Sequence, residues 1–177
     1  MISMQAVMLL AGEGTRMRPL TYTKPKPLLK IAGKTILEHN LEQLKANDIK
    51  DIVLVVGYIN EEIKKFLEKF SEFNFKFVLQ NEQLGTGNAL IQVESLTNDG
   101  KFLVIYGDDL YHRDDIKKCL NDDFCVAAKE VKYPERFGIF VVENGFLKNL
   151  VEKPEKFVSN LANTGLYVMN QEIFPIL

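Results

Sequence analysis

The sequence is poor in cysteine and histidine, with two residues of each among its 177. Cys119 and Cys125 lie six positions apart, and the only histidine near them in the chain is His112. This spacing does not match a zinc site. We therefore predict two reduced structural thiols, as is usual in a cytoplasmic protein.

Long apolar runs are also lacking. No segment approaches the roughly 20 consecutive apolar residues that span a bilayer. Residues 1–14 have no basic segment before their short apolar run and no cleavage-site pattern, so they do not resemble a signal peptide. We expect no membrane contact, and we expect residues 5–11 to form a first buried strand.

A strong excess of charge of one sign is absent as well. The 22 Lys and Arg residues nearly balance the 24 Asp and Glu residues, and the net charge of −2 argues against a broad basic surface for nucleic acid. The length suits one domain with a real core and is too short for two comfortable ones. Local clusters of Arg and Lys are therefore the informative feature.

Buried strand patterns alternate with amphipathic helix patterns through the first 120 residues. Strands are expected at 5–11, 51–57, 75–80 and 101–106, and helices at 35–46, 60–70, 85–96 and 112–120. Thr35 and Asn60 are expected to cap the first two helices. This alternation predicts a mostly parallel sheet with helices on both faces.

The pattern changes in the second half. Strands are expected at 124–131, 138–143, 146–152 and 164–169, joined by short turns such as Asn144-Gly145, which is a strong hairpin signal. We interpret them as an antiparallel extension of the same sheet. Residues 170–177 begin what resembles another helix and stop, so we expect residues 1–177 to be a single domain truncated at its C-terminus.

The loop after the first strand carries two glycines, Gly12 and Gly14, followed by several cations. A strand that ends in a glycine turn exposes backbone N–H groups to phosphate. Met17 stands where a dinucleotide-binding loop would have its third glycine, and the Gly-Lys-Ser/Thr of a P-loop is absent. The loop therefore predicts a polyphosphate site of another kind.

The composite motif in this loop resembles the signature of the sugar-phosphate nucleotidyltransferases, the sugar-nucleotide pyrophosphorylases. It reads Gly14-Thr15-Arg16, then Pro19-Leu20-Thr21, then Pro25-Lys26-Pro27. Further segments that resemble the family follow in order and extend the resemblance over about residues 5–170: Gln80 with Gln83-Leu84-Gly85-Thr86-Gly87, Tyr106-Gly107-Asp108, Phe137-Gly138, Glu152-Lys153-Pro154 and Asn163-Thr164-Gly165.

The subfamily signals are mixed. The loop is more similar to glucose-1-phosphate thymidylyltransferases and uridylyltransferases. Residues 82–87 are more similar to N-acetylglucosamine-1-phosphate uridylyltransferases, a mixture that resembles archaeal bifunctional members.

The resemblance implies the three-layer, Rossmann-like α/β fold of the nucleotide-diphospho-sugar transferases. It also implies a reaction in which a sugar 1-phosphate attacks the α-phosphorus of a nucleoside triphosphate and pyrophosphate leaves in line. No protein nucleophile is required, because positioning and charge neutralisation supply the catalysis.

The resemblance also implies roles for individual residues. Arg16 would neutralise the β- and γ-phosphates, Lys26 would lie near the α-phosphate and the sugar phosphate, and Asp108 would hold Mg²⁺. The nucleotide-binding residues would be Leu10, Ala11, Gly12, Gly14, Thr15, Gln80, Gly85 and Thr86. The sugar-phosphate-binding residues would be Gly138, Glu152, Lys153, Asn163 and Thr164.

Base selection is expected to depend on Gln80. Its amide offers a donor and an acceptor that match the O4 and N3–H edge of uracil or thymine, which favours UTP or dTTP over GTP, CTP or ATP. Leu10 stands where family members usually carry alanine and is expected to tighten the base pocket. The family's second acidic metal ligand would lie beyond Leu177, so Asp108 alone is expected to hold Mg²⁺ poorly.

Structural roles are the alternatives for these residues. Arg16 and Lys26 would then be solvated loop cations, and Asp108 a helix cap. Lys153 would form a surface ion pair, and Asn163 would be a turn residue.

The sequence therefore predicts a cytoplasmic enzyme that joins glucose 1-phosphate or N-acetylglucosamine 1-phosphate to UTP or dTTP. One alternative is a fragment that binds nucleotide or sugar phosphate without turnover. The other is a GTP-dependent mannose-1-phosphate guanylyltransferase. The sequence leaves open a homo-oligomer and a downstream acetyltransferase domain.

Overall fold

One mixed sheet of eight strands organises the chain in the computed structural model, which describes residues 4–12, 14–57, 61–82 and 84–177. The strands follow the order β5-β4-β1-β6-β10-β8-β9, and β7 pairs with β10. Their bounds are β1 (Gln5–Leu9), β4 (Asp51–Val56), β5 (Asn74–Leu79), β6 (Phe102–Tyr106), β7 (Cys125–Glu130), β8 (Gly138–Glu143), β9 (Phe146–Glu152) and β10 (Leu161–Met169).

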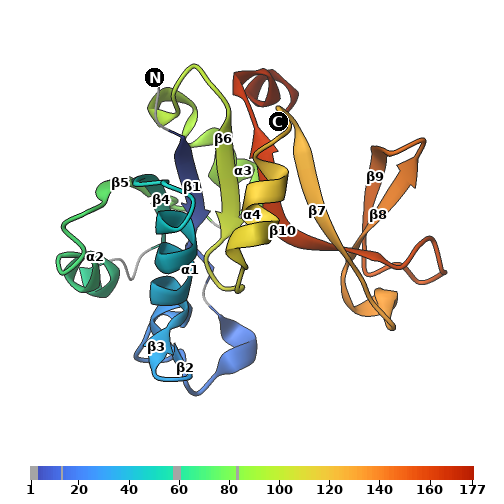
Figure 1. Cartoon of the computed structure of the whole chain (residues 1–177). Coiled ribbons are helices and arrows are strands. Elements are labelled where there is room, and N and C mark those ends of the chain that lie inside the picture. The colour runs from blue at the N-terminus through green and yellow to red at the C-terminus, as the bar shows by residue number, and fades with distance from the viewer. Residues whose placement is uncertain (1–3, 13, 58–60, 83) are drawn as a thin grey trace.

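Four parallel strands, β5, β4, β1 and β6, form the first half of this sheet. The helices α1 (Ile36–Lys45), α2 (Glu61–Leu67) and α4 (Arg113–Cys119) pack on one face, and α3 (Thr86–Ile91) packs on the other (Figure 1). Alternate residues of β1 therefore enter different cores, Ala6 and Met8 on the first face and Val7 on the second. The predicted three-layer α/β fold is confirmed.

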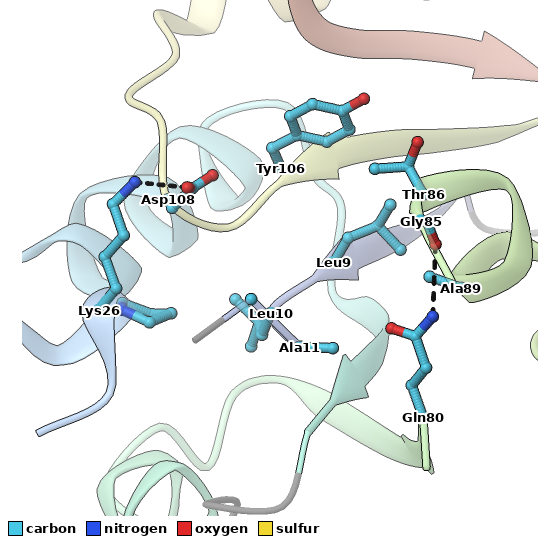
Figure 2. A pocket seen from close by; sticks show the side chains of 12 residues that line it. Leu9, Leu10, Ala11, Lys26, Gln80, Gly85, Thr86, Ala89, Tyr106 and Asp108 are labelled. Atoms are coloured by element: carbon cyan, nitrogen blue, oxygen red, sulfur yellow. Dashed lines mark hydrogen bonds and ion pairs between the residues drawn. The ribbon is translucent and has the colours of Figure 1, made fainter. Parts of the chain in front are cut away.

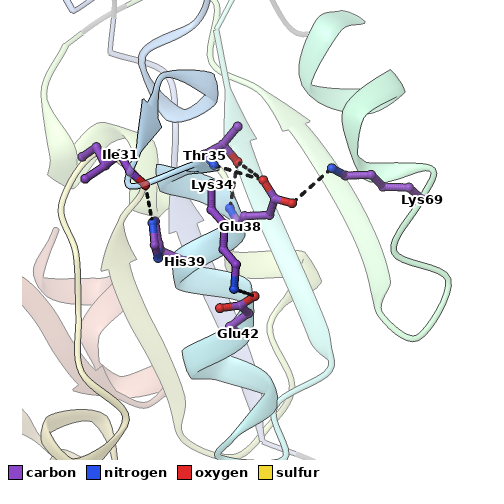
Figure 3. Close-up of polar contacts among 7 residues, drawn as sticks. All are labelled: Ile31, Lys34, Thr35, Glu38, His39, Glu42 and Lys69. Carbon is purple, nitrogen blue, oxygen red and sulfur yellow. Dashed lines mark hydrogen bonds and ion pairs between the residues drawn. The ribbon is translucent and has the colours of Figure 1, made fainter.

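Helix α1 begins as the sequence predicts. The Thr35 hydroxyl accepts a hydrogen bond from the Glu38 N–H (3.0 Å), and the Glu38 carboxylate accepts one from the Thr35 N–H (3.0 Å), which completes a capping box (Figure 3). The bond from the Thr35 N–H, with a smaller contribution from Lys69, holds the pKa of Glu38 below its ordinary value. The expected cap at Asn60 lies outside the described residues.

Some local features differ from the sequence prediction. The loop at 12–34 contains a small hairpin, β2 (Lys30–Ile31) and β3 (Lys34–Thr35), whose turn places Ala32 (φ 50°) and Gly33 (φ 88°) in the left-handed region. The helix expected over 85–96 ends at Ile91, and a separate 3₁₀ turn follows at Glu94–Leu96. The hydrogen bonds around Val93 join residues three positions apart, which is the 3₁₀ pattern. Val93 N donates to Leu90 O, and Leu96 N donates to Val93 O.

The second half of the sheet is antiparallel, as predicted. The β8–β9 hairpin turns through Asn144 (φ 52°) and Gly145 (φ 80°), the conformation that an Asn-Gly turn requires. In Figure 1 β8 and β9 extend to one side of the helical layers. Strand β10 begins at Leu161, three residues before its predicted start, because its first residues pair with β7 and β8.

The remaining 3₁₀ segments are Thr15–Met17, Lys26–Leu28, Pro134–Arg136 and Gln171–Ile176. Cys119 and Cys125 are free thiols, and burial raises the pKa of Cys119 to about 12, so this thiol stays protonated. Within the described ranges, no helix combines the length and the apolar character needed to cross a membrane.

Candidate functional site

A pocket of about 340 Å³ opens at the carboxyl ends of β1, β5 and β6. This edge of a parallel sheet is where ligands bind in open α/β folds. Its lining includes these residues singled out from the sequence: Leu10, Ala11, Gly12, Lys26, Gln80, Gly85, Thr86 and Asp108. The sequence analysis assigned no site role to four others: Leu9, Pro27, Ala89 and Tyr106.

Leu9, the last residue of β1, and Leu10, which follows it, line the pocket with side chains that point in different directions (Figure 2). Leu9 packs with the α3-side core, beside Ala89, whereas Leu10 is 6% exposed and belongs to the α1-side core. The alternation of side chains along a strand accounts for this division. Leu9 therefore lies on the α3 side of the pocket, and Leu10 packs mainly into the protein interior.

The loop after β1 folds back on itself at Gly14. Gly14 has φ 62°, and its carbonyl accepts a hydrogen bond from the Thr21 hydroxyl (2.8 Å). A Cβ on Gly14 would lie 3.0 Å from Thr21 Cγ2 and 3.2 Å from Lys26 Cβ. The close approach brings Lys26 to the pocket, while Arg16 lies exposed outside the pocket lining.

Lys26 meets Asp108 across the end of the pocket (Figure 2). Its Nζ lies 2.5 Å from Asp108 Oδ2, and the two side chains are 23% and 43% exposed. A pair that exposed contributes at most about 1 kcal/mol to stability. The structure thus joins the two charged groups that the resemblance implies for phosphate and metal binding.

The turn that carries Asp108 is held by helix α1. Asn40, 1% exposed, donates from Nδ2 to the carbonyl of Asp109 (2.8 Å), and its Oδ1 is a buried side-chain atom with no hydrogen-bond partner in the described chain. Desolvation, with a smaller contribution from the charge of Asp108, raises the pKa of Asp109. The described residues bring together no group of three His, Cys, Asp or Glu side chains suited to a metal.

The Gln80 amide is oriented by two neighbours. Gln80 is 6% exposed, and its Nε2 donates to the Gly85 carbonyl (3.3 Å) and to Asn88 Oδ1 (3.1 Å). Both amide hydrogens are therefore used, and within the described residues no group donates to Oε1, so this oxygen can accept from a ligand. This differs from the expectation of a donor and an acceptor. Asn88 was not identified from the sequence, because its role depends on the helix turn that brings it to Gln80.

A second group of sequence-predicted residues lies on β8, β9 and β10. Gly138 pairs with Glu152 in the β8–β9 ladder, and a Cβ on Gly138 would lie 2.9 Å from Glu152 Oε2 and 3.9 Å from Asn163 Cβ. We call Gly138, Glu152 and Asn163 the sugar-side cluster, after the role that the resemblance implies for them. Neither it nor Lys153 and Thr164 belongs to the pocket lining.

Lys153 and Thr164 lie beside this cluster, each with a structural contact. Lys153 has φ 44°, and its Nζ is 3.8 Å from Glu152 Oε1, with both side chains exposed. The Thr164 hydroxyl donates to the Ala127 carbonyl (2.8 Å), which ties β10 to β7. Lys153 therefore keeps an accessible charge, whereas the Thr164 proton is used within the sheet.

Comparison with known proteins identifies a family and several similar proteins. The family described as nucleotidyl transferase matches residues 5–177. The bifunctional protein GlmU of Methanocaldococcus jannaschii is 42% identical over 177 residues, and the match covers 98% of this chain and 42% of the relative. The chain thus spans less than half the length of that curated relative.

Two other similarities differ in what their names say about substrates. A mannose-1-phosphate guanyltransferase of Yarrowia lipolytica is 34% identical over 187 residues, covering 98% of this chain and 51% of the relative. The structure of a UDP-glucose pyrophosphorylase complexed with UDP-glucose matches with a TM-score of 0.85 and 26% identity, covering 99% of this chain and 79% of that one.

Proposed function

The chain belongs to the nucleotidyl transferase family, and on this premise we propose that it joins a hexose 1-phosphate to UTP or dTTP, releasing pyrophosphate. The observation that carries the proposal is the pocket at the carboxyl ends of β1, β5 and β6, which Gln80, Lys26 and Asp108 line together. It combines an oriented amide, a cation and a carboxylate, which are the groups that a base, a phosphate and a divalent cation require.

The proposed reaction is an in-line displacement. A phosphate oxygen of the sugar 1-phosphate forms a bond to the α-phosphorus, and the bond from that phosphorus to the bridging oxygen of pyrophosphate breaks. Arg16 neutralises the leaving group, and Lys26 exchanges its ion pair with Asp108 for a contact with phosphate. Glu152, Lys153 and Asn163 hold the sugar phosphate.

Mg²⁺ is the cofactor we propose, with Asp108 as its protein ligand. An accessible carboxylate beside a phosphate site fits this hard cation, which commonly binds through one or two carboxylates and the substrate phosphates. When bound, Mg²⁺ supplies charge neutralisation on the phosphate oxygens. Asp108 lines the pocket and Asp109 does not, which makes Asp108 the better candidate of the two.

The proposed choice of base rests on the Oε1 acceptor of Gln80. Its Oε1 accepts from the ring N3–H of uracil or thymine and finds no donor at N3 of cytosine. Guanine also presents a ring N–H, and the similarity to a guanyltransferase favours GTP with mannose 1-phosphate as a second candidate. Because this chain covers only part of its curated relatives, a binding role without turnover is the other alternative.

Substitution of Lys26 tests the proposal, with the exposed Lys24 as the matched control. We expect Lys26→Ala to lower kcat by about 100-fold or more with the fold retained, since a preorganised charge at a phosphate contributes on this order. Lys24→Ala should lower kcat little. Equal turnover by wild type and Lys26→Ala would remove the role assigned to this residue.

A further inference from the structure

A chain of hydrogen bonds joins the pocket to the sugar-side cluster. The hydroxyl of Tyr106, a residue that lines the pocket, lies 3.1 Å from the hydroxyl of Tyr167. The Tyr167 hydroxyl lies 2.8 Å from Asn163 Oδ1, and the backbone N–H of Gly165 donates to the same oxygen over 2.8 Å. We call Tyr106, Tyr167 and Asn163 the tyrosine–asparagine chain.

The direction of every bond in this chain can be assigned. The Gly165 N–H can only donate, so the side-chain atom that faces it is the oxygen of Asn163 and not the nitrogen. An amide oxygen only accepts, so Tyr167 donates to it. Tyr167 has one hydroxyl proton, which leaves Tyr106 as the donor in the bond between the two hydroxyls.

The rings and backbone around this chain restrict its movement. Gly165 has φ 71°, and a Cβ there would lie 2.3 Å from Tyr106 Cδ2, so the Tyr106 ring lies directly against the β10 backbone. Tyr111 adds a brace, because its hydroxyl accepts from the Tyr106 N–H (3.1 Å) and lies within donating distance of the carbonyls of Thr164 (3.0 Å) and Gly165 (3.1 Å). Burial raises the pKa of Tyr167 well above its ordinary value, which keeps the donated proton in place.

These contacts orient the Asn163 amide and leave its nitrogen, Nδ2, for a ligand. Its oxygen is held by two donors, its residue is partly exposed, and no residue in the described ranges accepts a hydrogen bond from its Nδ2. Its Cβ lies beside Gly138, next to the Glu152 carboxylate. A molecule bound there meets N–H donors from one side chain and a carboxylate acceptor from the other.

We propose that Tyr167 is a positioning residue that, supported by Tyr106, fixes the Asn163 amide with its N–H groups available to the sugar. The site then favours a sugar 1-phosphate that presents a hydrogen-bond acceptor, a carbonyl or hydroxyl oxygen, to Asn163. This inference rests on the proposed function, because it assigns the partner of a residue placed on the sugar side.

The test is a double-mutant cycle of Tyr167→Phe and Asn163→Asp in the full protein. The aspartate keeps an acceptor oxygen for Gly165 and Tyr167 but has no N–H to give. We expect each single substitution to raise KM for the sugar 1-phosphate about tenfold, as loss of one oriented hydrogen bond does, with KM for the nucleotide within about twofold. Tyr133→Phe, at an exposed tyrosine, is the control and should change neither the KM for the sugar 1-phosphate nor the KM for the nucleotide.

Non-additivity separates positioning from general damage to the structure. Because Tyr167 acts through Asn163, the double variant should have the same KM for the sugar 1-phosphate as Asn163→Asp alone. Effects that multiply in the double variant would overturn the proposal. So would an unchanged KM in Tyr167→Phe.

A spectroscopic readout keeps this test independent of turnover. The side-chain N–H signals of Asn163, identified by their loss in Asn163→Asp, should be sharp in the wild type and shifted or broadened in Tyr167→Phe. If the wild type uses no sugar 1-phosphate, the proposed function fails. The Asn163 signals still test whether the tyrosine–asparagine chain positions the amide. Asn163 signals that are identical in wild type and Tyr167→Phe would overturn the positioning role.

Discussion

Lys26 Nζ and Asp108 Oδ2 lie 2.5 Å apart, although 82 positions separate the two residues in the sequence. The pair forms because the loop after β1 folds back at Gly14 and the turn after β6 ends at the same edge of the sheet. Each charge neutralises the other, so a phosphate that binds Lys26 must compete with Asp108.

Asp108→Asn removes this competitor. We expect the variant to bind UTP several-fold more tightly than the wild type in the presence of EDTA, because Lys26 is free and one negative charge is gone. Turnover with Mg²⁺ should fall by about 100-fold or more, because the proposed metal ligand is lost. Calorimetric titration of UTP with and without Mg²⁺ measures the first effect.

Asp114→Asn, on the exposed start of α4, controls for the change in net charge. Weaker binding of UTP in EDTA by Asp108→Asn would contradict the competition. Unfolding free energies should differ from wild type by less than about 1 kcal/mol, as for an exposed ion pair.

Asn88 is predicted to control base discrimination through Gln80. Asn88→Leu removes the acceptor for one Gln80 hydrogen, so the amide can turn its nitrogen to the pocket. We expect the ratio of kcat/KM for UTP over CTP to fall by about five- to tenfold. Gln92→Ala, at the exposed C-terminal end of the same helix, should leave that ratio unchanged. A ratio unaffected by Asn88→Leu would show that the amide is held by other contacts.

The capping box predicts a pH dependence of stability. The folded-state pKa of Glu38 is lowered, chiefly by the Thr35 N–H, so its stabilising effect is present above the ordinary glutamate value of 4.5 and is lost as pH falls through the folded value. Glu38→Gln should therefore flatten the decline of unfolding free energy below about pH 4.5. The exposed Glu62→Gln serves as control. Parallel curves for wild type and Glu38→Gln in denaturant titrations would contradict this reading.

Tyr111→Phe should destabilise the junction between β6 and β10. The substitution removes one hydroxyl that accepts from the Tyr106 N–H and lies 3.0 Å from the Thr164 carbonyl and 3.1 Å from that of Gly165. We expect a loss of about 1–3 kcal/mol in unfolding free energy, the cost of leaving buried polar groups unpaired. Tyr133→Phe should cost less than about 0.5 kcal/mol, as an exposed substitution does. Equal stability of the two variants would mean that water replaces the hydroxyl.

The strands and the order of the layers were predictable because burial determines where apolar residues occur in the sequence. Residues 51–56 are almost wholly apolar since β4 is covered on both faces, and Asn144-Gly145 fits one turn type. The β2–β3 hairpin was not predictable, because Ala32 gives little sign of a left-handed conformation.

Site residues that belong to a sequence motif were predictable. Site residues whose role depends on contacts between distant elements were not. Lys26, Gln80 and Asp108 come from the family resemblance, and they line one pocket. Asn88 and Tyr167 act through hydrogen bonds to residues in other segments, and nothing in their own spacing indicates those partners.

The central claim is transfer of a nucleotidyl group to a sugar 1-phosphate. It is tested most directly by initial rates of pyrophosphate release with UTP, dTTP, GTP and CTP, each paired with glucose, N-acetylglucosamine and mannose 1-phosphates in Mg²⁺. We predict release that depends on the sugar phosphate and is fastest with UTP or dTTP. Release fastest with GTP and mannose 1-phosphate would favour the guanylyltransferase alternative, and no release from the full-length protein with any pair would contradict the account.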